Sequence, residues 1–267
     1  MQTNNIKIGI IGCGNMGAAV ACGLANGTKI KPENIFVGDI NIENLTKIKN
    51  FDNRINVTES NLEVVQNADI IIIAVKPWIV ESVVNQIQQF IDPQKHIVIS
   101  LAAMVEISEL LGFLQSAPAI YRIVPNTAIE FGQSMTAIAS ANTSVEQDEL
   151  VMSIFAELGK VIQVSEKQIP AFMSLTSCGI AFALRYIRAA MTGGVQMGIS
   201  AKMAEQAVLQ TLRGAITLLE TNDLHPEEEI DRVTTPGGIT IIGLNEMEAN
   251  GFSNAVIKGL IASKPTK

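Results

Sequence analysis

The chain has 267 residues, of which 48% are hydrophobic and 17% charged. This length and composition can build one large or two medium globular domains, and they exclude an intrinsically disordered chain. The formal net charge of −7 argues against non-specific binding of nucleic acid, which requires a basic face.

No apolar run reaches the length expected of a membrane span, and no signal peptide is visible at the N-terminus. The cysteines, Cys13, Cys22 and Cys178, are scattered and form no C-x-x-C pair. We therefore expect reduced thiols without a disulfide framework, no metal site, no membrane partner and a cytoplasmic location.

The first structural signal is a strand, a glycine-rich turn and a helix in immediate succession. Residues 6–11 form a continuous apolar run typical of a buried parallel strand, and an alanine-rich helix is expected over about 16–25. Between them, Gly12, Gly14 and Gly17 fit G-x-G-x-x-G, whose glycines allow a tight turn, close approach of a pyrophosphate and tight helix packing. The predicted dinucleotide-binding residues of this stretch are Gly12, Gly14, Asn15, Met16 and Gly17.

A second strand is expected over 34–39, and it ends in Asp39. An acid at this strand end accepts hydrogen bonds from the adenine ribose, and no arginine follows directly to hold a 2′-phosphate, which favours NADH over NADPH mildly. Alternatively, Asp39 caps a helix that starts at Asn41 or Ile42.

Three later strands, expected over 68–75, 96–101 and 119–124, end in polar or tightly turning residues. Because ligands bind at the carboxyl ends of parallel strands, these strand ends are candidate cofactor sites. The residues concerned are Val75, Lys76, Pro77, Ala102 and Asn126. With closing strands over 135–139 and 161–164 around a helix over 145–158, the alternation predicts an N-terminal Rossmann-type doubly wound parallel sheet, residues 1–164.

From residue 165 onward the strand signal ends. Long apolar helices are expected over 167–192 and 200–221, with Ser200 as a cap, so residues 165–267 should form an all-helical domain. We expect dimerisation, because such helices cannot bury their apolar faces within one small bundle. The turn Thr234–Thr240, rich in glycine and threonine, is a candidate cradle for a carboxylate.

Taken together, these motifs resemble pyrroline-5-carboxylate reductase. The resemblance rests on the N-terminal Ile-Gly-Cys-Gly-Asn-Met-Gly, Ala-Val-Lys-Pro at 74–77, Arg-Ile-Val-Pro-Asn-Thr at 122–127 and, most specifically, Thr-Pro-Gly-Gly-Ile-Thr at 235–240. It implies reduction of 1-pyrroline-5-carboxylate to L-proline by NADH or NADPH, the last step of proline synthesis, in a dimer or larger homo-oligomer such as a decamer.

By position, the resemblance implies that the C-terminal turn holds the substrate carboxylate and that Thr240 places its hydroxyl at the ring nitrogen as the catalytic residue. The resemblance also implies that Lys76 and Asn126 lie along the nicotinamide. The implied substrate-binding residues are Thr176, Thr235, Gly237, Gly238 and Thr240.

The start of the long second-domain helix departs from the family pattern. The family has Ser-Gly-Ser-Gly-Pro-Ala where this chain has Thr-Ser-Cys-Gly-Ile-Ala, residues 176–181. Two alternatives remain open on this ground. The first is a related enzyme, either another imine reductase or a β-hydroxyacid dehydrogenase, although Lys167 lies ahead of the place where the latter family has its catalytic lysine. The second is a homologue that binds dinucleotide without turnover.

Overall fold

The computed structural model describes residues 5–265. Contacts divide the chain into two compact units, one ending at Ser177 and one spanning Cys178–Pro265. The boundary expected from the sequence lies earlier, at residue 165, because the strand pattern ends there.

The N-terminal unit is a single eight-stranded sheet in the order β3-β2-β1-β4-β5-β6-β7-β8. All neighbouring strands pair in parallel except β6 and β7, which are antiparallel. The predicted parallel sheet is confirmed with this one exception. The strands are β1 (Ile8–Ile11), β2 (Ile35–Gly38), β3 (Asn56–Thr58), β4 (Ile70–Ile73), β5 (Ile97–Ser100), β6 (Ala119–Val124), β7 (Ser134–Ala141) and β8 (Gly159–Gln163).

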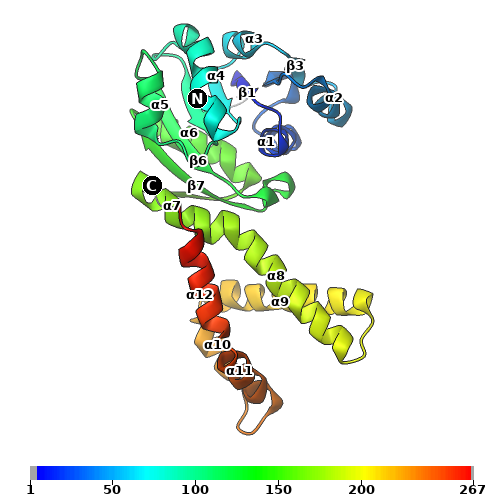
Figure 1. Ribbon diagram of the computed structural model, residues 1–267. Coiled ribbons are helices and arrows are strands. Elements are labelled where there is room, and N and C mark those ends of the chain that lie inside the picture. Colours follow the sequence, from blue (N-terminus) through cyan, green and yellow to red (C-terminus); the bar gives the residue numbers. More distant parts are fainter. Residues whose placement is uncertain (1–4, 266–267) are drawn as a thin grey trace. The chain divides into compact units, whose positions relative to one another are not determined.

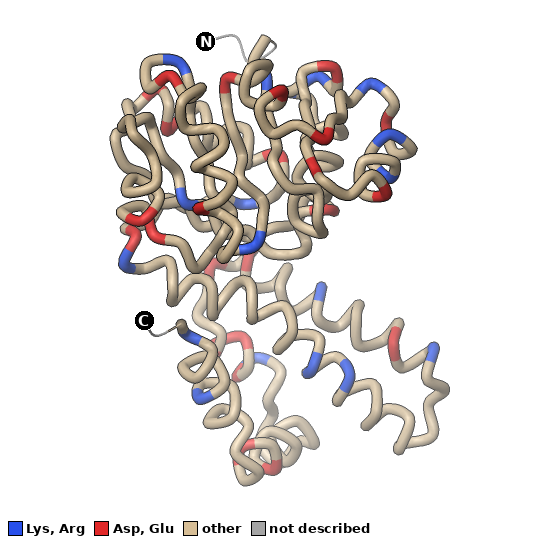
Figure 2. The backbone as a smooth tube through the Cα atoms, turned by 45° about the horizontal axis from the view of Figure 1, so that its top comes forward, with Lys and Arg blue, Asp and Glu red and all other residues tan. Residues whose placement is uncertain are grey.

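The central strands are buried on both faces. Every residue of β1, β4, β5 and β6 is buried, as their continuous apolar runs predicted. Two apolar clusters form the core, one on each face of the sheet. Acidic and basic residues both occur at many positions along the backbone of this unit (Figure 2).

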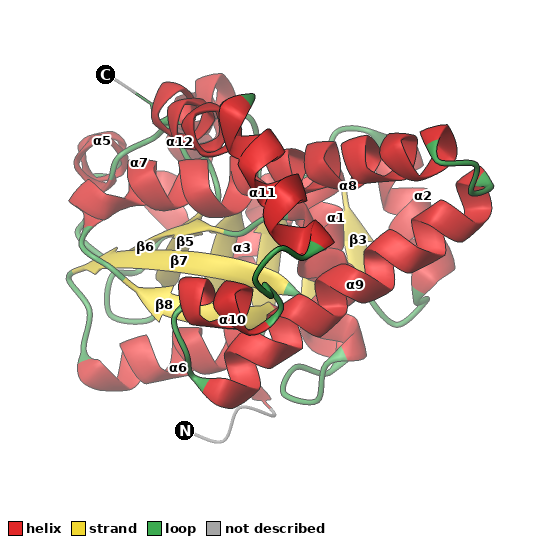
Figure 3. Ribbon diagram, turned by 90° about the horizontal axis from the view of Figure 1, so that it is seen from below, coloured by secondary structure: helices red, strands yellow, loops and turns green. Residues whose placement is uncertain are grey.

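Helices cover both faces, as a doubly wound sheet requires (Figures 1 and 3). Helices α1 (Asn15–Asn26), α2 (Ile42–Phe51) and α6 (Val145–Phe155) pack into one apolar cluster. Helices α3 (Asn61–Gln66), α4 (Val80–Ile87), α5 (Ile107–Phe113) and α7 (Ile169–Phe172) pack into the other. A π-helical turn, Met173–Cys178, follows α7 directly.

The C-terminal unit is entirely helical, as expected. Its helices are α8 (Gly179–Gln196), α9 (Ala201–Asn222), α10 (Pro226–Arg232), α11 (Ile239–Ala249) and α12 (Phe252–Ser263). Ser200 caps α9 through the Met203 N–H, as predicted. Helices α8 and α9 approach closely at Gly194, where a Cβ would lie 3.0 Å from that of Ala204.

This unit has almost no core of its own. Among its described residues, only Gly194 and Ala204 are buried. Large apolar side chains are exposed along its helices, including Leu184, Ile216 and Ile239, the last 89% exposed. An apolar surface of this extent is typical of an interface with another chain.

The helical run Glu166–Gln196 is 31 residues long and apolar enough, by length and composition alone, to cross a membrane. No run of this kind was expected from the sequence. The finding does not by itself indicate a membrane span, because helices of water-soluble proteins pass the same test. Here the run includes the π-helical turn, and only its later part, helix α8, belongs to the helical unit with the exposed apolar surface.

Candidate active site

A cavity of about 850 Å³ opens at the carboxyl edge of the parallel sheet, beside the ends of β1, β2, β4 and β5. This edge, next to the point where the strand order reverses between β1 and β4, is where ligands bind in doubly wound sheets. Most of the predicted cofactor residues line the cavity: Gly12, Gly14, Asn15, Met16, Asp39, Val75, Lys76, Pro77 and Ala102.

The glycine turn has the geometry that its spacing predicted. Gly12 has a φ of +97°, in the region that favours glycine. Gly17 lies behind the turn, where a Cβ would overlap the Gly12 carbonyl, so its absence lets α1 pack against β1. A Cβ on Gly14 would meet no atom within 4 Å, because this residue faces the open cavity.

The N-terminus of α1 faces the cavity without a capping side chain. Its N-cap residue is Gly14, and no side chain accepts a hydrogen bond from the first turn. Free N–H groups at a helix start attract anions. The turn can therefore receive a pyrophosphate, which supports the fit of a dinucleotide to these residues.

Asp39 links the glycine turn to the start of α2. Its Oδ2 accepts a hydrogen bond from the Cys13 N–H at 2.6 Å, and its Oδ1 accepts one from the Asn41 N–H at 2.7 Å. The N-cap of α2 is Asn41, whose side chain accepts from the Glu43 N–H, so Asp39 itself is not the cap. Each carboxylate oxygen keeps a lone pair for a ribose hydroxyl.

Burial makes Cys13 an unreactive thiol. Its side chain is 2% exposed, and burial together with the nearby Asp39 carboxylate raises its pKa to about 12. The thiol therefore stays protonated at neutral pH. These properties favour a role of Cys13 in fitting a small side chain into the turn over a role in redox chemistry.

The far wall of the cavity comes from the loops after β4 and β5. Lys76 is exposed and precedes a short 3₁₀ turn, Pro77–Ile79. Ala102 is buried, and its N–H donates to the Ser100 hydroxyl at 3.2 Å. The following residues, Ala103 and Met104, also line the cavity.

A buried arginine on β6 fixes this second loop. Arg122 is 5% exposed, donates to the Ala103 carbonyl and pairs with the Glu166 carboxylate at 2.9 Å. The same Glu166 oxygen accepts from the Ile107 N–H at 2.7 Å. Arg122 thus connects the cavity loop, the start of α5 and the segment that follows β8.

Asn126 lies outside the residues that line the cavity. It is 5% exposed; its Oδ1 accepts from the Ala128 N–H at 3.0 Å, and its Nδ2 donates to the Thr176 carbonyl at 3.2 Å. The structure therefore brings together Asn126 and Thr176, a predicted cofactor residue and a predicted substrate residue. Their roles toward ligands stay predictions.

The predicted substrate turn caps helix α11 in the C-terminal unit. Gly237 has a φ of +71°, and Gly238, the N-cap, donates its N–H to the Thr235 carbonyl at 2.9 Å. Helix α11 has no capping side chain and no acidic residue in its first turn. Thr235 and Thr240 are exposed beside these free N–H groups, an arrangement suited to a carboxylate.

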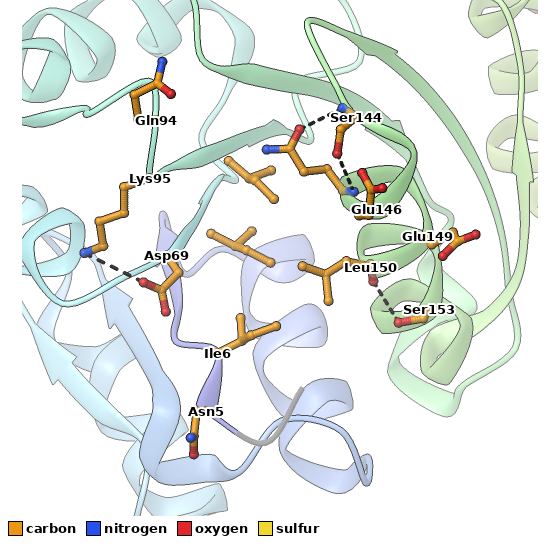
Figure 4. Close-up of a pocket in the computed structure, with 13 residues that line it drawn as sticks. Asn5, Ile6, Asp69, Gln94, Lys95, Ser144, Glu146, Glu149, Leu150 and Ser153 are labelled. Carbon is orange, nitrogen blue, oxygen red and sulfur yellow. Dashed lines mark hydrogen bonds and ion pairs between the residues drawn. The ribbon is translucent and has the colours of Figure 1, made fainter. Parts of the chain in front are cut away.

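A larger cavity, about 1010 Å³, lies at the opposite, amino edge of the sheet (Figure 4). Buried isoleucines at the strand starts, such as Ile70 and Ile97, and Leu150 of α6 form its apolar wall. Its rim carries the Asp69–Lys95 ion pair at 3.8 Å. None of the predicted site residues lines it, so size alone does not identify the functional cavity.

Several residues that line the cavity at the carboxyl edge were not predicted from the sequence. Two are exposed isoleucines, Ile40 after Asp39 and Ile79 after Pro77, which are 88% and 40% exposed. Ser82 and Gln86 lie one turn apart on α4. A polar i, i+4 pair on the helix after a predicted ligand-binding strand end could have indicated the latter two.

Comparison with known proteins is consistent with this geometry. Residues 166–266 match the family model described as pyrroline-5-carboxylate reductase dimerisation, and residues 7–104 match NADP oxidoreductase coenzyme F420-dependent. Pyrroline-5-carboxylate reductase 2 of Dictyostelium discoideum is 37% identical over 97% of this chain and 91% of its own length. The chain belongs to the pyrroline-5-carboxylate reductase family.

Pyrroline-5-carboxylate reductase 1 of the same organism is 39% identical, but the chain spans only 49% of its length. Among solved structures, the pyrroline carboxylate reductase of Plasmodium falciparum with NADP bound is 30% identical, with a TM-score of 0.89 over 97% of this chain and 96% of that one. The reductase of Coxiella burnetii has a TM-score of 0.88 at 29% identity, over 97% of this chain and 96% of that one. The expected architecture, a Rossmann-type domain followed by a helical dimerisation domain, is confirmed.

Proposed function

We propose that the chain reduces 1-pyrroline-5-carboxylate to L-proline with NADH or NADPH. The observation that carries this proposal is the cavity lined by the glycine turn, Asp39 and the Lys76 loop, in a chain that belongs to the pyrroline-5-carboxylate reductase family. We place the functional boundary at residue 165, with dinucleotide binding in 1–164 and substrate binding and dimerisation in 165–267.

The cofactor supplies the hydride, and the residues of the cavity orient it. The N–H groups at the start of α1 bind the pyrophosphate, and Asp39 accepts hydrogen bonds from the adenine ribose. Ile40 and Ile79 offer apolar surfaces for the adenine ring. Asp39 without a following arginine favours NADH mildly, while the related Plasmodium falciparum structure has NADP bound.

The substrate is held through its carboxylate. The free N–H groups of α11 and the Thr235 hydroxyl donate to it, and the left-handed Gly237 lets the turn wrap the group closely. Thr240, in the first turn of the same helix, then directs its hydroxyl to the ring nitrogen. Once the imine is protonated, the protein needs only to orient its carbon toward the hydride and stabilise the nitrogen.

The C-terminal helices also mediate self-association. The family model that matches this region describes dimerisation, and the exposed apolar surface of the unit is consistent with an interface between copies. We propose a dimer or a larger homo-oligomer, with the apolar side chains of the Glu166–Gln196 run covered by protein and not by lipid. The three cysteines are free, which suits the reducing cytoplasm.

The direct test supplies 1-pyrroline-5-carboxylate together with NADH carrying deuterium at the transferable position. The proposal predicts L-proline with one deuterium on the ring carbon that was the imine carbon. Cofactor binding without labelled proline would contradict the reductase activity and favour a homologue that binds dinucleotide without turnover.

A further inference from the structure

The segment that leads into α8 is not a continuous α-helix. After α7 the backbone widens into the π-helical turn Met173–Cys178 and narrows again at Gly179. A π-helical turn interrupts the regular hydrogen-bond ladder and occurs frequently at functional sites. Thr176, a predicted substrate residue, lies within this turn.

Two side-chain hydrogen bonds tie the π-helical turn to the end of β6. The Asn126 Nδ2 donates to the Thr176 carbonyl at 3.2 Å, and the Ser177 hydroxyl donates to the Pro125 carbonyl at 3.0 Å. Asn126 is itself immobilised, because its Oδ1 accepts from the Ala128 N–H and its own N–H donates to the buried Ser134 hydroxyl at 3.1 Å. The turn is therefore anchored to a rigid strand end.

The Thr176 side chain is oriented by the same turn. Its hydroxyl donates to the Phe172 carbonyl, four residues earlier, at 2.8 Å. A carbonyl oxygen can only accept, so this bond fixes the direction of the hydroxyl proton and leaves the Thr176 oxygen lone pairs for another group. Backbone and side chain of Thr176 are thus both held in place.

Ser177 occupies the position where the family pattern Ser-Gly-Ser-Gly-Pro-Ala has its first glycine. Glycine has no hydroxyl, so the bond from Ser177 to the Pro125 carbonyl has no counterpart in that pattern. Glycine also gives the backbone more freedom than serine. The departure thus replaces a flexible residue by one that is hydrogen-bonded to the strand end.

We propose that Ser177 is a positioning residue that, together with Asn126, clamps the π-helical turn to the end of β6 and holds Thr176 in position to contact the substrate. The contact of Thr176 with substrate rests on the proposed function. The clamp itself rests on the hydrogen bonds and does not depend on the activity.

The test compares the full-length protein with Ser177→Ala. Hydrogen exchange of peptides covering residues 173–182 should become about fivefold faster, the effect expected from loss of one hydrogen bond. The KM for 1-pyrroline-5-carboxylate should rise about fivefold while the Kd of NADH stays unchanged. Ser177→Thr retains a hydroxyl and should restore both values.

Ser153→Ala is the matched control. The Ser153 hydroxyl on α6 also donates to a backbone carbonyl, that of Leu150 at 2.9 Å, and the residue lies outside the proposed site. It should change neither exchange in 173–182 nor the KM. Unchanged exchange in Ser177→Ala would overturn the clamp. Faster exchange in Ser177→Ala, combined with absence of turnover in the wild-type protein, would support the clamp and overturn the proposed function instead.

Discussion

The Asp39 carboxylate and the Cys13 N–H are joined by a hydrogen bond of 2.6 Å beside the cavity that Asp39, Gly12 and Gly14 line. This bond holds the centre of the glycine turn against the end of β2. The residue predicted to select the cofactor is therefore also part of the scaffold of the proposed pyrophosphate site.

Replacing Asp39 by Ser should weaken the binding of both cofactors, because the glycine turn loses a hydrogen-bond acceptor. The binding of NADH should weaken more, because the adenine ribose hydroxyls also lose their acceptor. Trp78, the only tryptophan, is 78% exposed between two residues that line the cavity, so its fluorescence offers a way to measure both Kd values. Equal losses for NADH and NADPH would contradict a ribose contact and leave Asp39 a scaffold residue alone.

Two glycines of the same turn should respond differently to alanine. Gly14→Ala should fold normally, since its Cβ meets no protein atom, but should bind NADH poorly because the Cβ occupies the approach of the pyrophosphate. Gly17→Ala forces α1 away from Gly12 and should lower the free energy of unfolding by about 1–3 kcal/mol.

Gly112→Ala on α5 is the control, because its Cβ also meets no atom and it lies outside the cavity. Urea denaturation and NADH titration together separate the variants. Normal NADH affinity in Gly14→Ala would contradict the position assigned to the pyrophosphate.

Thr240→Ala should lower kcat/KM by about a hundredfold or more while NADH binding is preserved, because a single oriented hydroxyl contributes this much when charge develops at the reacting atom. Thr217→Ala on α9 is a matched control, since its hydroxyl donates only to the Arg213 carbonyl at 2.8 Å. Steady-state kinetics measure both. Full activity of Thr240→Ala would contradict the catalytic role proposed for Thr240.

His96 should make the stability depend on pH. Burial, reinforced by Lys95, lowers the His96 pKa below its ordinary value, so the unfolded chain binds a proton that the folded chain does not. Stability should therefore fall as pH drops below about 6.5. In His96→Asn, whose side-chain oxygen can replace Nδ1 as acceptor for the Asp92 N–H, this dependence should disappear in thermal melts. An unchanged slope would show that other groups cause it.

The sequence predicted the order of strands and helices because buried parallel strands are continuous apolar runs. Strand β6 matches its expected range, and Ser200 was identified correctly as a cap. Helix α5 was missed, since it spans only Ile107–Phe113 and its capping box has Glu106 at the N-cap in place of the usual serine or threonine, with Glu109 three residues later. The antiparallel direction of β7 was not predicted, because the direction of a strand does not change its pattern of hydrophobic residues.

The candidate site was predictable where local sequence determines geometry and not where distant segments meet. The glycine turn could be predicted because its conformation depends only on the spacing of Gly12, Gly14 and Gly17. Three other contacts join residues that are far apart in the chain: Cys13 with Asp39, Arg122 with Glu166 and Ser177 with Pro125, at separations of 26, 44 and 52 residues. No local sequence pattern predicts contacts between residues so far apart in the chain.

The most direct test of the account is the rate of NADH and NADPH oxidation with 1-pyrroline-5-carboxylate, followed by the nicotinamide absorbance and compared between wild type and Thr240→Ala. The account predicts turnover with both cofactors, a modestly higher kcat/KM with NADH, and loss of most activity in the variant. Tight cofactor binding without oxidation in the wild-type protein would contradict it.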